Sequence, residues 1–363
     1  MDFSLSEDQL SFQASVRGLL ERSCSLDVVR AVAAGDRGAA ERVVRDLDAL
    51  GVRGVMAPDA AGGLGLGLLD AVIIQEMIGR QCAPGDFSGA AIVIAGLSSF
   101  GGTSAARAWM TKVVSGEVRP GVALAERIGV RDGTGLRLEG GRLLGRSLFV
   151  ADGDTATHVF IALPSGSLAI VDATAPGVSR VPLRTIDATR VFSEILFDGV
   201  PAEVLTGESL AGAAVNRMTA VARLLVAADA LGAMQVMLER AVAYSLERKQ
   251  FGRVIGSFQA VKHMCAEMAA RLEPLRALIW HAAHAFDEGS EEADLLILLA
   301  KSHAAEVGVF IARTATEVHG GMGFTDLVGL HYWFKRIGVS RQLFGAPEAV
   351  RREAARLQGW VSS

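Results

Sequence analysis

Two segments of the sequence combine side chains that could bind a phosphate-bearing cofactor. The first runs from Glu247 to Gly252 (E-R-K-Q-F-G), and Gln259 follows eight residues after Phe251. The guanidinium of Arg248 can hold a phosphate through two parallel hydrogen bonds, and the Phe251 ring can pack on a flat group. The same string is also typical of a charged helix end closed by a glycine cap, so alone it specifies no cofactor.

The second segment, Glu317 to Phe324 (E-V-H-G-G-M-G-F), ends a long predicted helix in a glycine turn. Glycine allows the backbone to approach a ligand closely, because it has no side chain in the way. The alternative is an ordinary helix C-cap, with His319 as a hydrogen-bonded core histidine. This segment alone does not specify a cofactor either.

The composition is that of a globular protein and argues against nucleic-acid binding. The 363 residues include 36 Lys and Arg against 40 Asp and Glu, a formal net charge of −4, whereas nucleic-acid binders show a basic excess. Half of the residues are hydrophobic and 21% are charged, which is sufficient for a large core. The length predicts two or three domains.

Cysteine usage and the first residues predict a cytoplasmic protein. The three cysteines show no paired spacing, so we expect neither disulfides nor a metal site. Residues 1–4 lack the features of a signal peptide. The uncharged run of residues 87–106 is diluted by glycine and serine, so we expect a buried helix there, not a membrane span. It should stop at Gly101-Gly102, with Thr103 capping the next helix.

The hydrophobic pattern divides the chain into three predicted domains. Residues 1–117 show helical spacing, residues 118–208 form short β-favouring runs, and residues 209–363 return to long helical runs. The predicted fold class is therefore α+β and multidomain: an N-terminal α-helical domain, a middle β-barrel and a C-terminal four-helix bundle. The expected long helices span residues 68–80, 214–248, 260–288 and 291–318, and the expected strands span residues 121–125, 135–150, 158–163, 167–171, 178–183 and 191–197.

Together and in this order, the two cofactor segments resemble those of the acyl-CoA dehydrogenase family. The resemblance covers nearly the whole chain, including Leu5-Ser6-Glu7, Pro58 to Leu66 (the family's P-E-x-x-G-G-x-G) and Phe197 to Ala202. It implies FAD bound at a subunit interface and an electron-transferring flavoprotein as electron acceptor. In that family a carboxylate removes the α-proton of an acyl-CoA thioester, and the β-hydride passes to flavin N5.

By motif, six residues match the family positions that hold the ADP half of the neighbouring subunit's FAD. One of them departs from the family pattern, because Glu317 stands where Gln is usual. The six are Arg248, Phe251, Gln259, Glu317, Gly320 and Gly321.

The resemblance leaves the catalytic position without a carboxylate. Matching Gly345 and Arg351 to the family's catalytic segment puts Phe344 where the base should stand, and Phe cannot accept a proton. Some members carry the base on the long bundle helix instead. That position is Ala222, next to Arg223, which the resemblance makes a candidate substrate contact.

The resemblance also indicates changes at positions that serve the chain's own flavin. The segment Ala125 to Asp132 lacks the hydroxyl and the glycine-serine pair of the family's T-E-x-x-x-G-S-D. Ala151 replaces a Thr that bonds the flavin edge, and Ala346 removes a third hydroxyl.

The sequence therefore predicts the base-lacking partner in a heteromeric α2β2 acyl-CoA dehydrogenase, similar to those of actinobacterial steroid degradation. Such a subunit would complete the FAD site of a catalytic subunit. One alternative is a self-sufficient homotetramer with a relocated base, for which Glu348 is the nearest carboxyl group. Another is a flavin-free binding module, since fold does not determine function.

Overall fold

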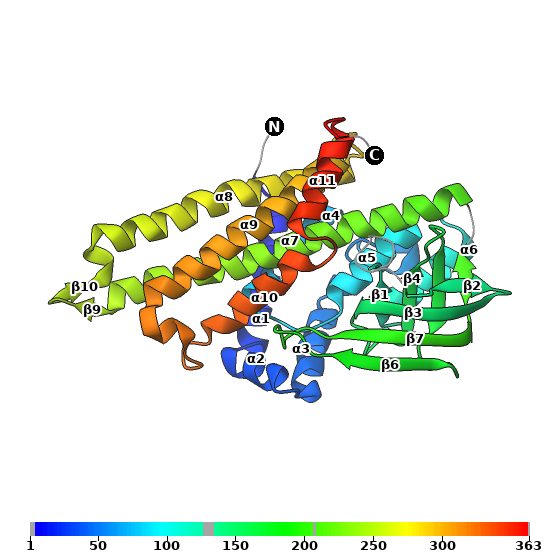
Figure 1. Ribbon diagram of the computed structural model, residues 1–363, viewed down its shortest axis with the longest axis horizontal. Coiled ribbons are helices and arrows are strands. Elements are labelled where there is room, and N and C mark those ends of the chain that lie inside the picture. The colour runs from blue at the N-terminus through cyan, green and yellow to red at the C-terminus, as the bar shows by residue number, and fades with distance from the viewer. Residues whose placement is uncertain (1–3, 126–133, 206–207, 362–363) are drawn as a thin grey trace. The chain divides into compact units, whose positions relative to one another are not determined.

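The chain follows the predicted order of helices, sheet and helices (Figure 1). The structure is a computed structural model that describes residues 4–125, 134–205 and 208–361, without the side chains of residues 208–211. The chain forms two compact units. One unit comprises residues 1–36, 72–83 and 223–363, and the other comprises residues 37–71 and 84–222. The boundaries of the three domains expected from the sequence stay a prediction.

The first helices begin at capping residues. The helical elements before the sheet are α1 (Glu7–Ser23), α2 (Leu26–Ala33), α3 (Arg37–Ala49), η1 (Val52–Gly54), η2 (Asp59–Ala61), α4 (Leu68–Arg80), α5 (Phe87–Ser98) and α6 (Ser104–Val114). Ser6 and Gln9 form a reciprocal capping box ahead of α1, with both hydrogen bonds at 3.1 Å. The predicted cap of α6 is confirmed, because the Thr103 side chain accepts from the Ala106 amide.

The apolar helices are packed inside the protein. Helix α5 has 12 residues, too few to cross a bilayer, and it is buried along most of its length, as predicted. Two other stretches, Gly212–Glu247 and Ala293–Phe324, are long and apolar enough to span a membrane. Their most apolar windows are 94% and 61% buried within the protein, as in the core helices of globular domains.

The middle of the chain forms one mixed sheet. Its strands are β1 (Pro120–Ala123), β2 (Arg137–Glu139), β3 (Arg142–Ala151), β4 (His158–Ala162), β5 (Leu168–Asp172), β6 (Val178–Leu183), β7 (Phe192–Pro201) and β8 (Glu203–Leu205). The order is β6-β7-β3-β1-β4-β5-β8, with β2 on β3; β1 and β4 are parallel and the other pairs antiparallel. The prediction of a single strand over residues 135–150 was wrong. Gly140 and Gly141, both at positive φ, turn it into the β2–β3 hairpin.

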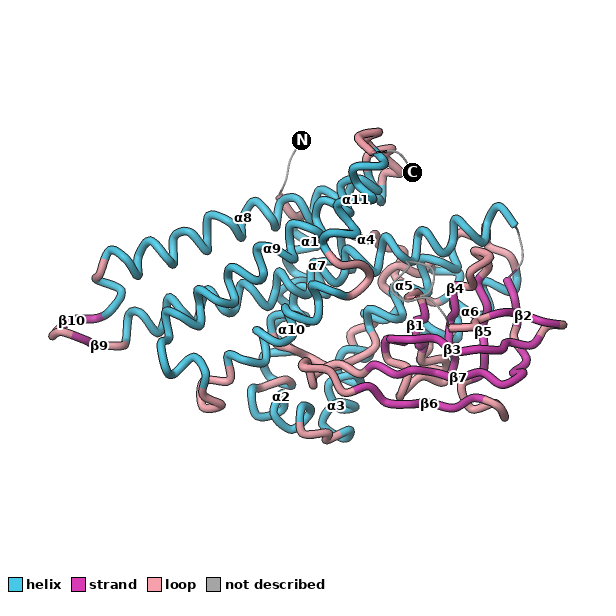
Figure 2. Tube along the Cα trace, in the orientation of Figure 1, coloured by secondary structure: helices cyan, strands magenta, loops and turns pink. Residues whose placement is uncertain are grey.

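The last third of the chain contains the long helices. Its elements are α7 (Glu208–Glu247), β9 (Lys249–Gln250), β10 (Arg253–Val254), η3 (Ile255–Ser257), α8 (Gln259–Asp287), α9 (Ala293–His319), η4 (Gly320–Phe324), α10 (Leu330–Gln342) and α11 (Pro347–Leu357). The three long helices are confirmed, with ends that differ by up to six residues. Helices α8, α10 and α11 all pack on α9, and α7 runs alongside (Figure 2). The β9–β10 hairpin was not predicted.

Helices α4 and α7 cross with their backbones in contact. A side chain at Gly79 of α4 would collide with the carbonyl of Asp229, and one at Gly232 of α7 would collide with the carbonyl of Glu76. Both positions therefore require glycine, because only its lack of a side chain permits so close an approach.

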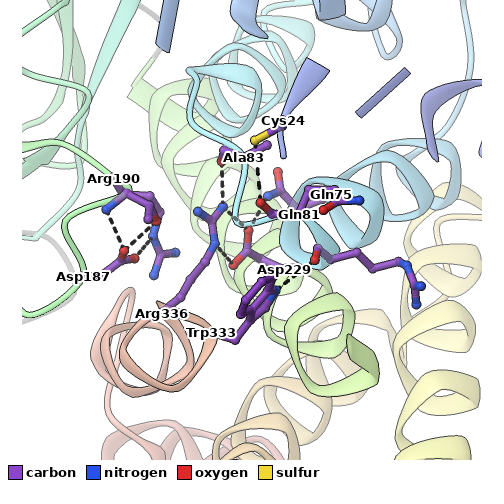
Figure 3. A network of polar contacts seen from close by, with 11 residues as sticks. Cys24, Gln75, Gln81, Ala83, Asp187, Arg190, Asp229, Trp333 and Arg336 are labelled. Carbon is purple, nitrogen blue, oxygen red and sulfur yellow. Dashed lines mark hydrogen bonds and ion pairs between the residues drawn. The ribbon is translucent and has the colours of Figure 1, made fainter. Parts of the chain in front are cut away.

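A buried ion pair lies beside this crossing (Figure 3). The Arg336 Nε and Nη2 atoms lie 2.8 and 2.7 Å from the two carboxylate oxygens of Asp229, and both side chains are 2% exposed. Gln75 of α4 donates to the same carboxylate at 2.8 Å, and Arg336 also donates to the Ala83 carbonyl at 3.1 Å. The pair therefore connects α10 to α7 and to the end of α4.

We expect Asp229→Ala to lower the free energy of unfolding by about 3–5 kcal/mol, because it leaves the Arg336 charge buried without its carboxylate. Glu21→Ala is the matched control. It breaks an ion pair with Arg17 in which both side chains are about half exposed, and such pairs contribute about 0–1 kcal/mol. Denaturant unfolding measures both. Equal effects would show that the buried pair is energetically unimportant.

Candidate functional site

The first predicted phosphate-binding segment forms the hairpin that follows α7. The Arg248 carbonyl accepts from the Ile255 amide at 2.8 Å, which closes the turn between β9 and β10. Phe251 sits at the tip of this turn with φ of +53° and is 91% exposed. Its ring meets Phe258 edge to face, with 6.2 Å between centroids. The segment is therefore more than a helix cap, because it presents an aromatic ring to solvent.

The second predicted segment ends α9. Gly320 has φ of +57°, and its amide donates to the Glu317 carbonyl. A Cβ atom at Gly320 or Gly321 would meet nothing within 4 Å, so the backbone of this turn is open to approach. The Glu317 side chain is exposed. His319 is buried, and its Nδ1 pairs with the Ala315 carbonyl at 2.7 Å, as expected of a core histidine.

A stacked ring pair brings the two segments together. The rings of Tyr244, in the last turn of α7, and His319, in the last turn of α9, lie 4.7 Å apart at 23°. Arg248 follows one turn after Tyr244, and Gln259 is the first residue of α8. The six residues predicted to hold the ADP half of FAD therefore lie at one end of the bundle: five at or next to helix ends, and Phe251 at the tip of the hairpin.

The charge at these helix ends fits an anion. The exposed cations there are Arg248, Lys249, Arg253 and Lys262, and they outnumber the exposed carboxylates of Glu247 and Glu317. The amide groups of the first turn of α8 add the positive end of a helix dipole. Burial lowers the pKa of His319, so that ring is neutral at pH 7 and the guanidinium and ammonium groups supply the charge. These residues fit the pyrophosphate of FAD, with open backbone at Gly320 and Gly321.

The expected base position holds a strained phenylalanine. Phe344 has φ of +55° and is followed by Gly345 at +118°. Its carbonyl accepts from Arg223 Nε at 3.0 Å, and the two Nη atoms of Arg223 lie 2.9 and 2.8 Å from the Glu353 carboxylate. Arg223, the predicted substrate contact, is thus engaged through all three nitrogens. Ala222, the alternative base position, is a fully buried methyl group.

Glu348, the nearest carboxyl group by sequence, lies on the surface. It stands in the first turn of α11, 3.1 Å from Arg341 and 3.8 Å from Arg351. Its own backbone N–H and the two guanidiniums lower its pKa below the usual value. A carboxylate held ionised in this way is a weak proton acceptor at neutral pH, because a general base works best with a pKa near 7.

The flavin-side positions carry methyl groups where the family carries hydroxyls. Ala125 is 8% exposed, Ala151 ends β3 and pairs with Val122 and Phe192, and Ala346 precedes α11. None of the three side chains can donate a hydrogen bond. The rest of the altered segment, Glu126 to Asp132, lies outside the described residues. Among the described side chains, Arg248 and Gln259 can therefore donate to the ADP half of FAD, whereas these three alanines cannot donate to its flavin ring.

Two residues at this site were missed by the sequence analysis. Glu353 pairs with Arg223 across 130 positions, a separation that no spacing rule detects. Lys301 is a buried cation whose signal was present, since it ends the apolar run from Leu295 to Ala300. Across the described ranges, no three His, Cys, Asp or Glu side chains gather as a metal site would require.

Comparisons with known proteins agree with this architecture. Residues 6–117 match the acyl-CoA dehydrogenase N-terminal domain, and residues 212–358 match the acyl-CoA dehydrogenase C-terminal domain. The chain is 29% identical over 350 residues to the acyl-CoA dehydrogenase IpdE2 of Mycolicibacterium smegmatis, covering 96% of this chain and 98% of that protein.

Two solved structures share the complete fold. The Tcur3481-Tcur3483 steroid acyl-CoA dehydrogenase variant superposes with a TM-score of 0.87 at 29% identity, covering 98% of this chain and 99% of that one. The ChsE4-ChsE5 complex from Mycobacterium tuberculosis gives 0.88 at 26% identity, with complete coverage of both chains. The chain therefore belongs to the acyl-CoA dehydrogenase family of FAD-dependent oxidoreductases, which act on the CH–CH group of acyl-CoA thioesters.

Proposed function

We propose that this chain is the non-catalytic subunit of a heteromeric acyl-CoA dehydrogenase and completes the FAD site of a base-carrying partner. The main support for the proposal is the set of side chains at the expected base position. Phe344 stands there, its carbonyl is bonded to Arg223, and the adjacent carboxylate of Glu353 is bound to the same guanidinium. A proton acceptor for the α-carbon of a thioester is therefore expected from another chain.

The contrast between the two halves of the cofactor site supports this proposal. The residues proposed to hold the neighbour's ADP moiety lie at helix ends and at the hairpin tip, and Phe251 and Arg248 are exposed to solvent. At the flavin-side positions, three methyl groups replace donors, and each missing hydrogen bond to a buried polar edge costs about 1–3 kcal/mol. When bound, FAD supplies the hydride acceptor. This chain's part is to hold its pyrophosphate through Arg248 and the first turn of α8.

Two of the similar structures support a two-chain assembly. One is described as a complex of ChsE4 with ChsE5, and the other joins Tcur3481 to Tcur3483 and is described as a steroid acyl-CoA dehydrogenase. By analogy, we propose an α2β2 assembly, a steroid-derived acyl-CoA as substrate, an electron-transferring flavoprotein as acceptor and a cytoplasmic location. The assembly, the substrate, the acceptor and the location are proposed from the similarity to these structures alone.

We expect the chain purified alone to be nearly colourless and inactive on acyl-CoA thioesters. Co-expression with its base-carrying partner should give a yellow complex with bound flavin and turnover. The measurement is the flavin-to-protein absorbance ratio after desalting, for the lone chain and for the complex. Stoichiometric flavin and turnover in the lone chain would contradict the proposal and favour a self-sufficient enzyme.

We expect Arg248→Ala to weaken FAD binding in the complex by about one to two orders of magnitude. A bidentate charge-assisted pair with pyrophosphate contributes roughly 1.5–3 kcal/mol, and each 1.4 kcal/mol is tenfold. Arg248→Lys should restore only part of this, because an ammonium keeps the charge without the planar fork. Flavin titration of the apo complex measures both. Arg352→Ala, which removes an exposed cation on α11 outside the proposed anion site, controls for general charge loss.

We expect Glu348→Gln to leave turnover of the complex unchanged within about twofold, because its ionised carboxylate lies at the surface between Arg341 and Arg351. The measurement is the steady-state rate with a fixed acyl-CoA. A loss of about a hundredfold or more would identify Glu348 as a relocated base.

A further inference from the structure

Two aromatic rings connect the helix ends that carry the predicted cofactor contacts. Tyr244 stands in the last turn of α7, and His319 is the last residue of α9. The centroids of the two rings lie 4.7 Å apart and their planes are inclined by 23°, which is a stacked arrangement. The proposed function assigns no role to either side chain.

Tyr244 is joined directly to the backbone of Arg248. The Arg248 amide donates to the Tyr244 carbonyl at 2.9 Å, and the Arg248 carbonyl accepts from the Ile255 amide at 2.8 Å. The next residue, Gly256, packs on the same helix end, because a Cβ atom there would lie 2.9 Å from the Ser245 carbonyl. The backbone that carries the Arg248 side chain is therefore fixed to the last turn of α7.

His319 is joined as directly to the glycine turn. It precedes Gly320 in the chain, and its Nδ1 pairs with the Ala315 carbonyl at 2.7 Å, which orients the ring. Further along the turn, a Cβ atom at Gly323 would lie 2.7 Å from the Thr316 carbonyl and 3.1 Å from the His319 Cβ. The turn thus packs on His319 and on the last turn of α9, so a shift of His319 would move the open backbone of the turn with it.

The stacked rings therefore link two predicted contacts for one anion. One contact is the Arg248 guanidinium, and the other is the open backbone at Gly320 and Gly321. A ligand held at two points binds tightly only when the separation of those points matches the ligand, and the residues behind the contacts set that separation. Aromatic rings suit this task, because a ring has few rotatable bonds and stacks at a defined spacing.

We propose that Tyr244 and His319 are positioning residues for FAD: their stacked rings set the separation between Arg248 and the glycine turn, and thereby the affinity for the pyrophosphate. This inference rests on the proposed function, because it takes the anion site at these helix ends as given. Neither ring has to touch the cofactor. Each acts through its own neighbour, Tyr244 through the Arg248 amide and His319 through the peptide bond to Gly320.

Titration of the apo complex with FAD tests the inference. We expect Tyr244→Leu, which removes the stack, to weaken FAD binding by about three- to tenfold, the effect of losing one aromatic pair. Tyr244→Phe keeps the ring and removes only the hydroxyl, so its affinity should stay within about twofold of the wild-type value. Trp109→Leu is the matched control, because Trp109 contacts the His158 ring at 5.1 Å in the other compact unit and is bonded to neither cofactor segment.

A double-mutant cycle shows whether Tyr244 acts through Arg248. When Arg248 is removed, one contact remains and the separation no longer matters, so Tyr244→Leu should have little further effect in the Arg248→Ala background. Full additivity of the two losses would overturn the positioning role, and so would an unchanged affinity in Tyr244→Leu. Equal losses in Tyr244→Phe and Tyr244→Leu would overturn it as well, because they would indicate a direct contact between the hydroxyl and the cofactor.

The same titrations separate this inference from the proposed function. If Arg248→Ala leaves FAD binding unchanged, the anion site itself is refuted and the positioning role fails with it. If Arg248→Ala weakens binding and Tyr244→Leu does not, only the positioning role fails. Circular dichroism and thermal melting check the folding of every variant. If Tyr244→Leu does not fold, Tyr244→Met, which has a longer apolar side chain without a ring, takes its place in the cycle.

Discussion

The close crossing of α4 and α7 is the constraint on which the helical unit depends. Gly79 and Gly232 bring the two backbones into contact, and Asp229, one turn away, then meets Gln75 and Arg336 in a space that excludes water. A wider crossing would admit solvent to the ion pair and separate it from Gln75. Two glycines and one buried charge pair therefore act together, because each is favourable only in the geometry that the other provides.

Charge is used in two different ways in this unit. Inside the unit, buried basic side chains bind partners within the chain. Arg336 pairs with Asp229, and Arg223 pairs with Glu353 and the Phe344 carbonyl. Lys301 donates to two carbonyls at the end of α10. At the helix ends, Arg248 and its neighbours remain in solvent. A ligand that needs several cations close together meets them at Arg248, Lys249, Arg253 and Lys262, so we expect an anion to bind at this end of the unit.

Much of the fold was predictable because it depends on local pattern. The caps, the long apolar helices and most strands follow from residues within a few positions of one another. The β9–β10 hairpin was missed because its residues are charged and its pairing comes from a turn at Phe251, a residue that rarely adopts positive φ. The Arg223–Glu353 and Asp229–Arg336 pairs join residues over a hundred positions apart, and tertiary packing alone creates such contacts. The assignment of the six cofactor residues came from resemblance and stays a prediction.

The exposed end of the helical unit also has a consequence for the life of the protein in a cell. Phe251, Phe324 and Leu327 are 91%, 80% and 75% exposed there, on turns that follow α7 and α9. Large bare apolar side chains are what chaperones and quality-control proteases recognise on incomplete assemblies. In the proposed heteromer, a copy synthesised in excess of its partner would carry this signal permanently. The abundance of this chain would then be set by degradation of the unassembled copies.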